Sequence, residues 1–90
     1  MEPNNVTWRE LLEDVMSHYK GESIAGLEHI TLSDEELDVA FDAGWGGTEG
    51  KPFYAWSKNR VYFPATYDGS EWVSSVPRNP SDENPGHVGG

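Results

Sequence analysis

The Asp68-Gly69 pair constrains the fold more than any other feature of the sequence. Both residue types accept the positive φ angles of a two-residue β-turn, and apolar residues alternate on either side of it. Pairing outward from this turn joins strands near 60–66 and 70–76, and a second turn at Lys58-Asn59 adds a strand near 52–57. The sequence therefore predicts an antiparallel meander.

Alternation along these strands divides their side chains between two faces, and the turns set which residues share a face. We expect one face to form the core beneath a helix, and it contains Tyr54, Trp56, Val61, Phe63, Ala65, Trp72 and Val76. The opposite face contains Phe53, Arg60, Tyr62, Glu71 and Val73. Pro64 cannot donate a ladder hydrogen bond, so a bulge or an early strand end is expected there.

An N-terminal helix is the second predicted element. Thr7 and Glu10 have the spacing of a capping box, apolar residues then recur at helical spacing as far as Tyr19, and Gly21 follows as a stop signal. These features predict a helix over about residues 8–20. The predicted fold class is α+β, with an N-terminal helix packed on a three- or four-stranded antiparallel sheet.

The segment that follows the helix supports two interpretations. Ser33 and Glu36 have the spacing of a second capping box, whereas apolar residues alternate from Leu37 to Phe41 as they do in a strand. Both conformations stay open, and we favour a strand over 36–42.

The 90 residues fit one domain without cysteine, so the four Trp, four Tyr and three Phe must supply much of the burial. After residue 79 the chain is rich in Pro, Asn and Gly and has little to bury. We therefore divide the chain into a single acidic α+β domain over 1–79 and a flexible C-terminal tail over 80–90.

The net charge of −10 disfavours direct contact with nucleic acid or an anionic membrane, because both would repel the chain. A basic protein surface is the favoured partner. The first residues lack the basic and apolar regions of a secretion signal, and the absence of cysteine fits a reducing compartment. A cytoplasmic location is expected.

The charge is also unevenly distributed. Residues 1–50 contain twelve acids and two bases (12 − 2 = 10 negative), whereas residues 51–90 contain four of each. This asymmetry favours an acidic half that is presented to a partner. Ordinary solubility charge, or adaptation to high salt, explains the same pattern and stays an alternative.

Motifs for catalysis are missing from the sequence. The glycine-rich segment 44–50 matches neither the dinucleotide-binding pattern nor the Walker loop, and the three histidines lack zinc-binding spacing. The acids around Asp38 lack the glycine of a calcium loop. We expect no enzymatic activity, no cofactor and no metal site.

The stretch RVYFPATYDGSEWVSSVPRNP, joined to an acidic N-terminal half, resembles the small proteins of phages and mobile elements, among them acidic inhibitors of the anti-CRISPR and anti-restriction type. Many of those inhibitors occupy a nucleic-acid groove as DNA mimics. The resemblance implies a phage protein that inhibits a host nuclease or CRISPR effector complex by a protein–protein interaction, in the cytoplasm of the host cell.

Carboxylates at alternate strand positions, or one turn apart on a helix, form rows of negative charge like a phosphate backbone. The residues expected to contact the basic surface are Glu10, Glu13, Asp14, Asp34, Glu36, Asp38 and Asp42.

Two other functions stay open. An aromatic face with Trp45, Tyr62 and Phe53 could bind a peptide or a glycan. The terminal Gly89-Gly90 resembles the terminus of ubiquitin-like carriers and modifiers, which implies attachment through the C-terminus.

Overall fold

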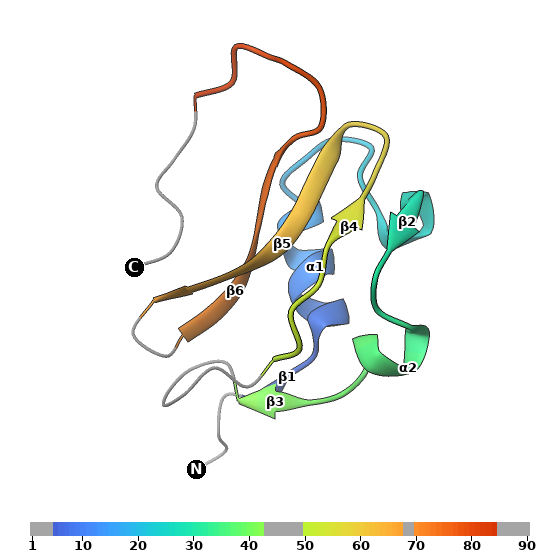
Figure 1. The fold of residues 1–90 in the computed structure, drawn as a ribbon, viewed down its shortest axis with the longest axis vertical. Helices are drawn as coiled ribbons and strands as arrows, with labels where there is room; N and C mark the ends of the chain where they lie inside the picture. Colours follow the sequence, from blue (N-terminus) through green and yellow to red (C-terminus); the bar gives the residue numbers. More distant parts are fainter. Residues whose placement is uncertain (1–4, 43–49, 68–69, 85–90) are drawn as a thin grey trace.

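The computed structural model describes residues 5–42, 50–67 and 70–84 (Figure 1). The elements follow in the order β1 (Asn5–Val6), α1 (Trp8–Met16), the 3₁₀ helix η1 (Ile24–Gly26), β2 (His29–Ile30), α2 (Asp34–Leu37), β3 (Phe41–Asp42), β4 (Ala55–Trp56), β5 (Arg60–Tyr67) and β6 (Ser70–Pro77). The fold is α+β, as predicted, with α1 packed on a four-stranded antiparallel sheet in the order β2-β4-β5-β6. Strands β1 and β3 form a separate two-stranded sheet.

Helix α1 begins as the sequence predicts. The Thr7 hydroxyl accepts a hydrogen bond from the Glu10 amide at 3.1 Å, and the Glu10 carboxylate accepts one from the Thr7 amide at 3.0 Å. The helix ends at Met16, however, and not near residue 20. The amides of His18 and Tyr19 each bond the carbonyl three residues back, so the chain tightens into turns before Gly21 takes a φ of +82°.

The predicted strand over 36–42 is wrong. Ser33 and Glu36 form a complete capping box, which begins the short helix α2, and only Phe41–Asp42 are extended. The helical turn buries Leu37 and leaves Val39 on the surface, 59% exposed, whereas a strand would have placed both on one face. Two cap hydrogen bonds formed within four residues outweigh the weak preference of a short alternating run.

The hairpin predicted from the Asp-Gly turn is confirmed. Strands β5 and β6 pair over their full length, from Arg60 opposite Pro77 to Tyr67 opposite Ser70, although the turn residues 68–69 lie outside the described ranges. Strand β4 is shorter than the predicted 52–57.

Pro64 neither ends β5 nor forms a bulge in its pairing with β6, in contrast to the expectation. The Ser57 amide bonds the Arg60 carbonyl at 2.9 Å, so the alternation of an antiparallel ladder directs the amide positions of residues 60, 62 and 64 toward β4. The N–H that proline lacks therefore falls on the β4 side. Strand β5 continues beside β6, with Pro64 opposite Val73, while the ladder to β4 ends at Ala55.

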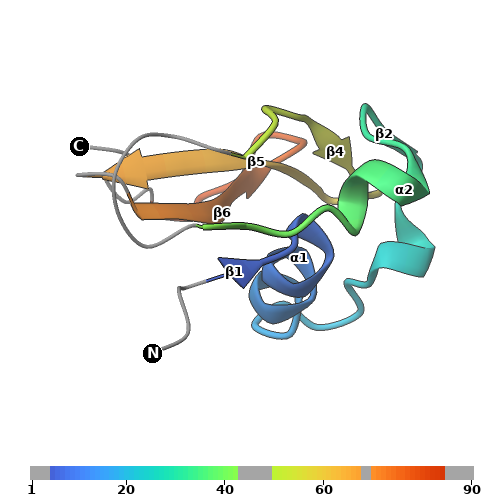
Figure 2. The same ribbon diagram turned by 90° about the horizontal axis from the view of Figure 1, so that it is seen from below.

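The two faces of the sheet are the reverse of those predicted. The face packed on α1, here called the inner face, buries Phe53, Ala55, Tyr62 and Val73 against Trp8, Leu12 and Met16. Residues expected in the core lie on the other side, here called the outer face, where Tyr54 is 55% and Val76 is 43% exposed. Figure 2 shows α1 on one side of β5 and β6.

The inner face accepts two charged residues because distant groups pair with them. The Arg60 guanidinium lies 3.9 Å from the centre of the Tyr19 ring and bonds both oxygens of Glu83 at 2.8 and 3.0 Å. The Glu71 carboxylate accepts a hydrogen bond from the Gly50 amide at 3.0 Å. Both side chains are thereby buried without leaving a charge unsatisfied.

Glu83 also fixes part of the predicted tail. Its carboxylate holds the chain against β5, and the Arg78 amide bonds the Asn59 carbonyl at 2.8 Å. The flexibility expected for 80–90 stays a prediction, and residues 85–90 lie outside the described ranges. Within the described part of the chain, no helix has the length and apolarity needed to cross a membrane.

Candidate binding surfaces

Helices α1 and α2 bring carboxylates from separate parts of the sequence together around Arg9. The Arg9 guanidinium bonds the Asp38 carboxylate at 2.7 and 3.2 Å, and it lies 4.0 Å from an oxygen of Asp34. The hydrogen bond from Arg9 lowers the pKa of Asp38, and the same contact raises the pKa of Arg9. Glu13, one turn along α1, adds to the negative potential at this point.

We define the acidic helical surface as the solvent-accessible carboxylates of the two helices and their ends: Glu10, Glu13, Asp14, Asp34, Glu35, Glu36 and Asp38. Arg9 and Lys51 are the cations paired with it, which leaves a formal charge of −5 (2 − 7). Six of these seven acidic residues are exposed and Glu36 is half-buried, so most of this charge is accessible to a partner.

The predicted acids differ in what else they do. Glu10 and Glu36 complete capping boxes, and Glu36 also pairs with Lys51, whose hydrogen bond lowers the pKa of the Glu36 carboxyl. Glu13 and Asp14 are exposed on α1, and the side chain of Asp34 is 97% exposed. These last three residues can contact a partner without giving up a cap.

Asp42 is set apart from the other predicted acids. It lies on β3, half-buried, opposite Asn5 in the β1–β3 ladder. The structure therefore groups six of the seven predicted residues on the two helices and their ends and places the seventh on the smaller sheet.

A small pocket adjoins the acidic helical surface. It has a volume of about 200 Å³ and is lined by Trp8, Glu36, Val39, Phe41, Gly50 and Lys51. The Trp8 indole N–H donates to the Lys51 carbonyl at 2.9 Å, and a Cβ on Gly50 would come within 2.4 Å of the indole, so only glycine fits there. The pocket could therefore bind an apolar side chain next to the Glu36 carboxylate.

The predicted aromatic site does not form. Tyr62 and Phe53 are buried on the inner face, and Trp45 lies outside the described residues. The Tyr62 hydroxyl donates to the Glu22 carboxylate, and burial, with this hydrogen bond, raises the pKa of Tyr62 well above its usual range. The prediction for Tyr62 and Phe53 was wrong because the two faces of the sheet are reversed.

The accessible aromatic side chains lie instead on the outer face. They are Tyr54, Trp56, Phe63, Tyr67 and Trp72. Tyr54 and Tyr67 are more than half exposed, and the ring centres of Tyr54 and Trp56 are 5.8 Å apart. The alternation of residues 54, 56, 61, 63, 65, 72 and 76 already grouped these positions on one face, but it could not indicate which face the helix covers.

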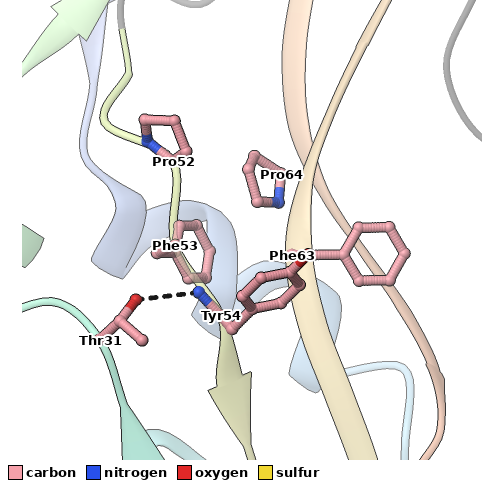
Figure 3. Close-up of a pocket in the computed structure, with 6 residues that line it drawn as sticks. All are labelled: Thr31, Pro52, Phe53, Tyr54, Phe63 and Pro64. Carbon is pink, nitrogen blue, oxygen red and sulfur yellow. Dashed lines mark hydrogen bonds between the residues drawn. The ribbon is translucent and has the colours of Figure 1, made fainter.

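A hollow of about 280 Å³ lies in the gap between Tyr54 and Pro64, where residues of both faces line it (Figure 3). Its lining is Thr31, Pro52, Phe53, Tyr54, Phe63 and Pro64. The hollow lies where the ladder between β4 and β5 stops at Pro64 and the two strands separate. On the far side, the Tyr54 amide is held by the Thr31 hydroxyl at 3.0 Å, so this rim is fixed.

No group of three or more His, Cys, Asp or Glu in the described ranges is arranged to hold a metal ion. No protein family model, curated protein or solved structure matches the chain. The candidate sites therefore rest on the geometry of the two surfaces. The hypothesis for Gly89-Gly90 falls outside the described residues and stays a prediction.

Proposed function

We propose that this chain is a non-catalytic inhibitor that binds, through its acidic helical surface, a basic protein surface that otherwise binds nucleic acid. The observation that carries the proposal is the convergence of α1 and α2 around Arg9, which gathers acids from two separate segments on one side of the molecule. A net charge of −5 at this surface attracts arginine and lysine side chains and speeds their encounter.

The arrangement supports mimicry of a phosphate backbone. Glu13 and Asp14 lie three and four residues after Glu10 on the same helix, and Asp34 lies across Arg9 from them. Arginine side chains that bind phosphates bind carboxylates by the same paired hydrogen bonds. The adjoining pocket at Trp8 and Phe41 gives such a partner an apolar anchor as well.

The resemblance to anti-CRISPR and anti-restriction proteins extends the proposal to the class of partner. A host nuclease or CRISPR effector complex has a deep basic groove, and a protein lodged there would exclude the nucleic acid. The proposal places this encounter in the cytoplasm of the host cell, without direct binding to nucleic acid or membrane.

Charge reversal tests the proposal. Glu13→Lys, Asp14→Lys and Asp34→Lys are combined, because none of these residues caps a helix. The wild type is immobilised and exposed to a bacterial lysate, and bound proteins are then eluted with duplex DNA. We expect a set of proteins that DNA displaces and that the triple variant fails to retain.

The matched control is Asp82→Lys, which changes an exposed acid in the C-terminal segment. It should retain the same proteins as the wild type. If the retained proteins withstand DNA and bind the triple variant equally, the acidic helical surface is not the binding site and the proposal is wrong.

A further inference from the structure

We propose that the outer face of the four-stranded sheet is the interface through which two copies of this chain form a dimer. The inference is independent of the proposed function, because it concerns a different set of residues. The register places His29, Trp56, Val61 and Val76 in one row across the sheet, with Tyr54, Phe63 and Trp72 beyond it.

None of these outer-face residues is Asp, Glu, Lys or Arg, although such residues make up 24% of the chain. At the border of the face, Glu28 and Arg78 neutralise each other in an ion pair. Depletion of charge together with enrichment of Tyr, Trp and Phe is the composition of an interface core.

The exposed aromatic area is the second observation. Tyr54 is 55% and Tyr67 is 61% exposed, and Trp56, Phe63 and Trp72 are half-buried between them. Figure 2 shows α1 on the inner side of β5 and β6, so this helix does not cover the outer face. A contiguous apolar patch on a small chain marks an interaction site.

The charge of the whole molecule selects the second copy as the occupant. Two chains that each carry −10 repel, and they can pack only where no carboxylates are brought face to face. The outer face meets this condition, since the described residues that the strand register places on it include no Asp or Glu. A basic partner could form no ion pairs with this face, because the face has no carboxylates. Single-stranded nucleic acid could stack on the aromatic rings, but the face has no Lys or Arg to bind its phosphates.

The geometry suits a two-fold arrangement. In an isologous dimer the same patch of each chain contacts the other, so a single contact buries the apolar face of both chains. The hollow between Tyr54 and Pro64 provides a recess for a side chain of the other copy. A chain of 90 residues without disulfides also has a thin core, and burial between copies is one means of stabilising it.

Sedimentation of the full chain tests the dimer directly. We expect a species of twice the 10.0 kDa chain mass, and its fraction should increase as salt rises from about 0.05 to 0.5 M. Salt screens the repulsion between two acidic chains and leaves an uncharged interface intact. Binding through the acidic helical surface has the opposite salt dependence, so failure of one proposal is distinguishable from failure of the other.

Matched substitutions locate the interface. Tyr54→Glu places a carboxylate on the outer face and should weaken the dimer by at least about tenfold, because the two-fold brings the new charges together. Val39→Glu makes the same kind of change at a residue with a similar exposed fraction on the helical side, and it should leave the dimer unchanged. Circular dichroism confirms that both variants fold.

Three results would overturn the dimer. The first is a wild type that stays monomeric at all salt concentrations up to about 1 mM protein. The second is a dimer that Val39→Glu disrupts and Tyr54→Glu does not. The third is a monomer whose outer face instead binds a neutral polysaccharide or an apolar peptide, as shown by loss of that binding in Tyr54→Glu.

Discussion

Individual residues of the inner face depend on partners that come from remote parts of the chain. Arg60 is buried because Glu83 and Ser75 accept its hydrogen bonds, and the ring of Tyr19 covers its guanidinium. Tyr62 is fully buried because its hydroxyl reaches Glu22. A partner removed from either pair leaves a polar group in the core without compensation.

Loss of the Glu83 carboxylate should destabilise the fold in a pH-dependent way. Arg60 lowers the pKa of Glu83, so the pair stabilises the folded state above the ordinary carboxyl pKa of 4.5. This contribution is lost as the pH falls through the lowered value. Glu83→Gln should therefore melt below the wild type at pH 7, and the difference should shrink below about pH 4. Asp82→Asn is the control, and a pH-independent difference would show that the ion pair is not the cause.

Tyr62→Phe isolates one buried hydrogen bond. The ring stays in place while the hydroxyl that donates to Glu22 is lost. Because Glu22 is half-buried and can turn to water, we expect a loss of about 1 kcal/mol in the free energy of unfolding. Urea denaturation measures it, and an unchanged midpoint would show that the hydrogen bond adds nothing to stability.

The elements differ in how far the sequence determines them. Capping boxes at Thr7 and Ser33 and the Asp68-Gly69 pair are local sequence signals. The elements typical of them, the helices α1 and α2 and the β5–β6 hairpin, are all present. The orientation of the sheet is not local. The sequence grouped the correct side chains on each face. The inner face was predicted to be exposed because it contains the charged residues Arg60 and Glu71, whose partners Glu83 and Gly50 come from distant segments.

The same limit applies to the candidate sites. Most of the acidic residues on α1 and α2 were predicted from the sequence, because the charge of a residue follows from its type alone. The sequence could not indicate that Glu36 and Asp38 form ion pairs with Lys51 and Arg9, or that Arg9 joins the two helices. Those roles depend on how the segments pack.

Two tryptophans distinguish the inner face from the outer face by stability. Trp8 is buried at the centre of the core, with its ring centre 4.6 Å from that of Phe41 and 5.0 Å from that of Phe53. Trp8→Ala should cost about 3–5 kcal/mol, or abolish folding.

Trp72→Ala, on the outer face, removes a half-buried ring and should cost less. Urea denaturation compares the two variants, with monomer and dimer resolved by repeating it at low protein concentration. Equal losses at that concentration would contradict the assignment of faces.

At the scale of the whole molecule, the sheet separates two surfaces of unlike chemistry. Helix α1, with its acids Glu10, Glu13 and Asp14, lies on one side of β5 and β6 (Figure 2), and the register places the aromatic side chains of the outer face on the other side. Each surface can therefore be altered without changing the other, which is why Glu13, Asp14 and Asp34 on one side and Tyr54 on the other serve as independent probes.

This back-to-back placement sets the valency of the molecule. Two copies joined through their outer faces would direct their acidic helices away from each other, so one dimer could engage two basic surfaces at once. Where those surfaces belong to a single assembly, the second contact forms at the high effective concentration of a tethered ligand. The dimer would then bind the assembly more tightly than either contact alone. Where they belong to separate molecules, the dimer would cross-link them in a 2:2 complex.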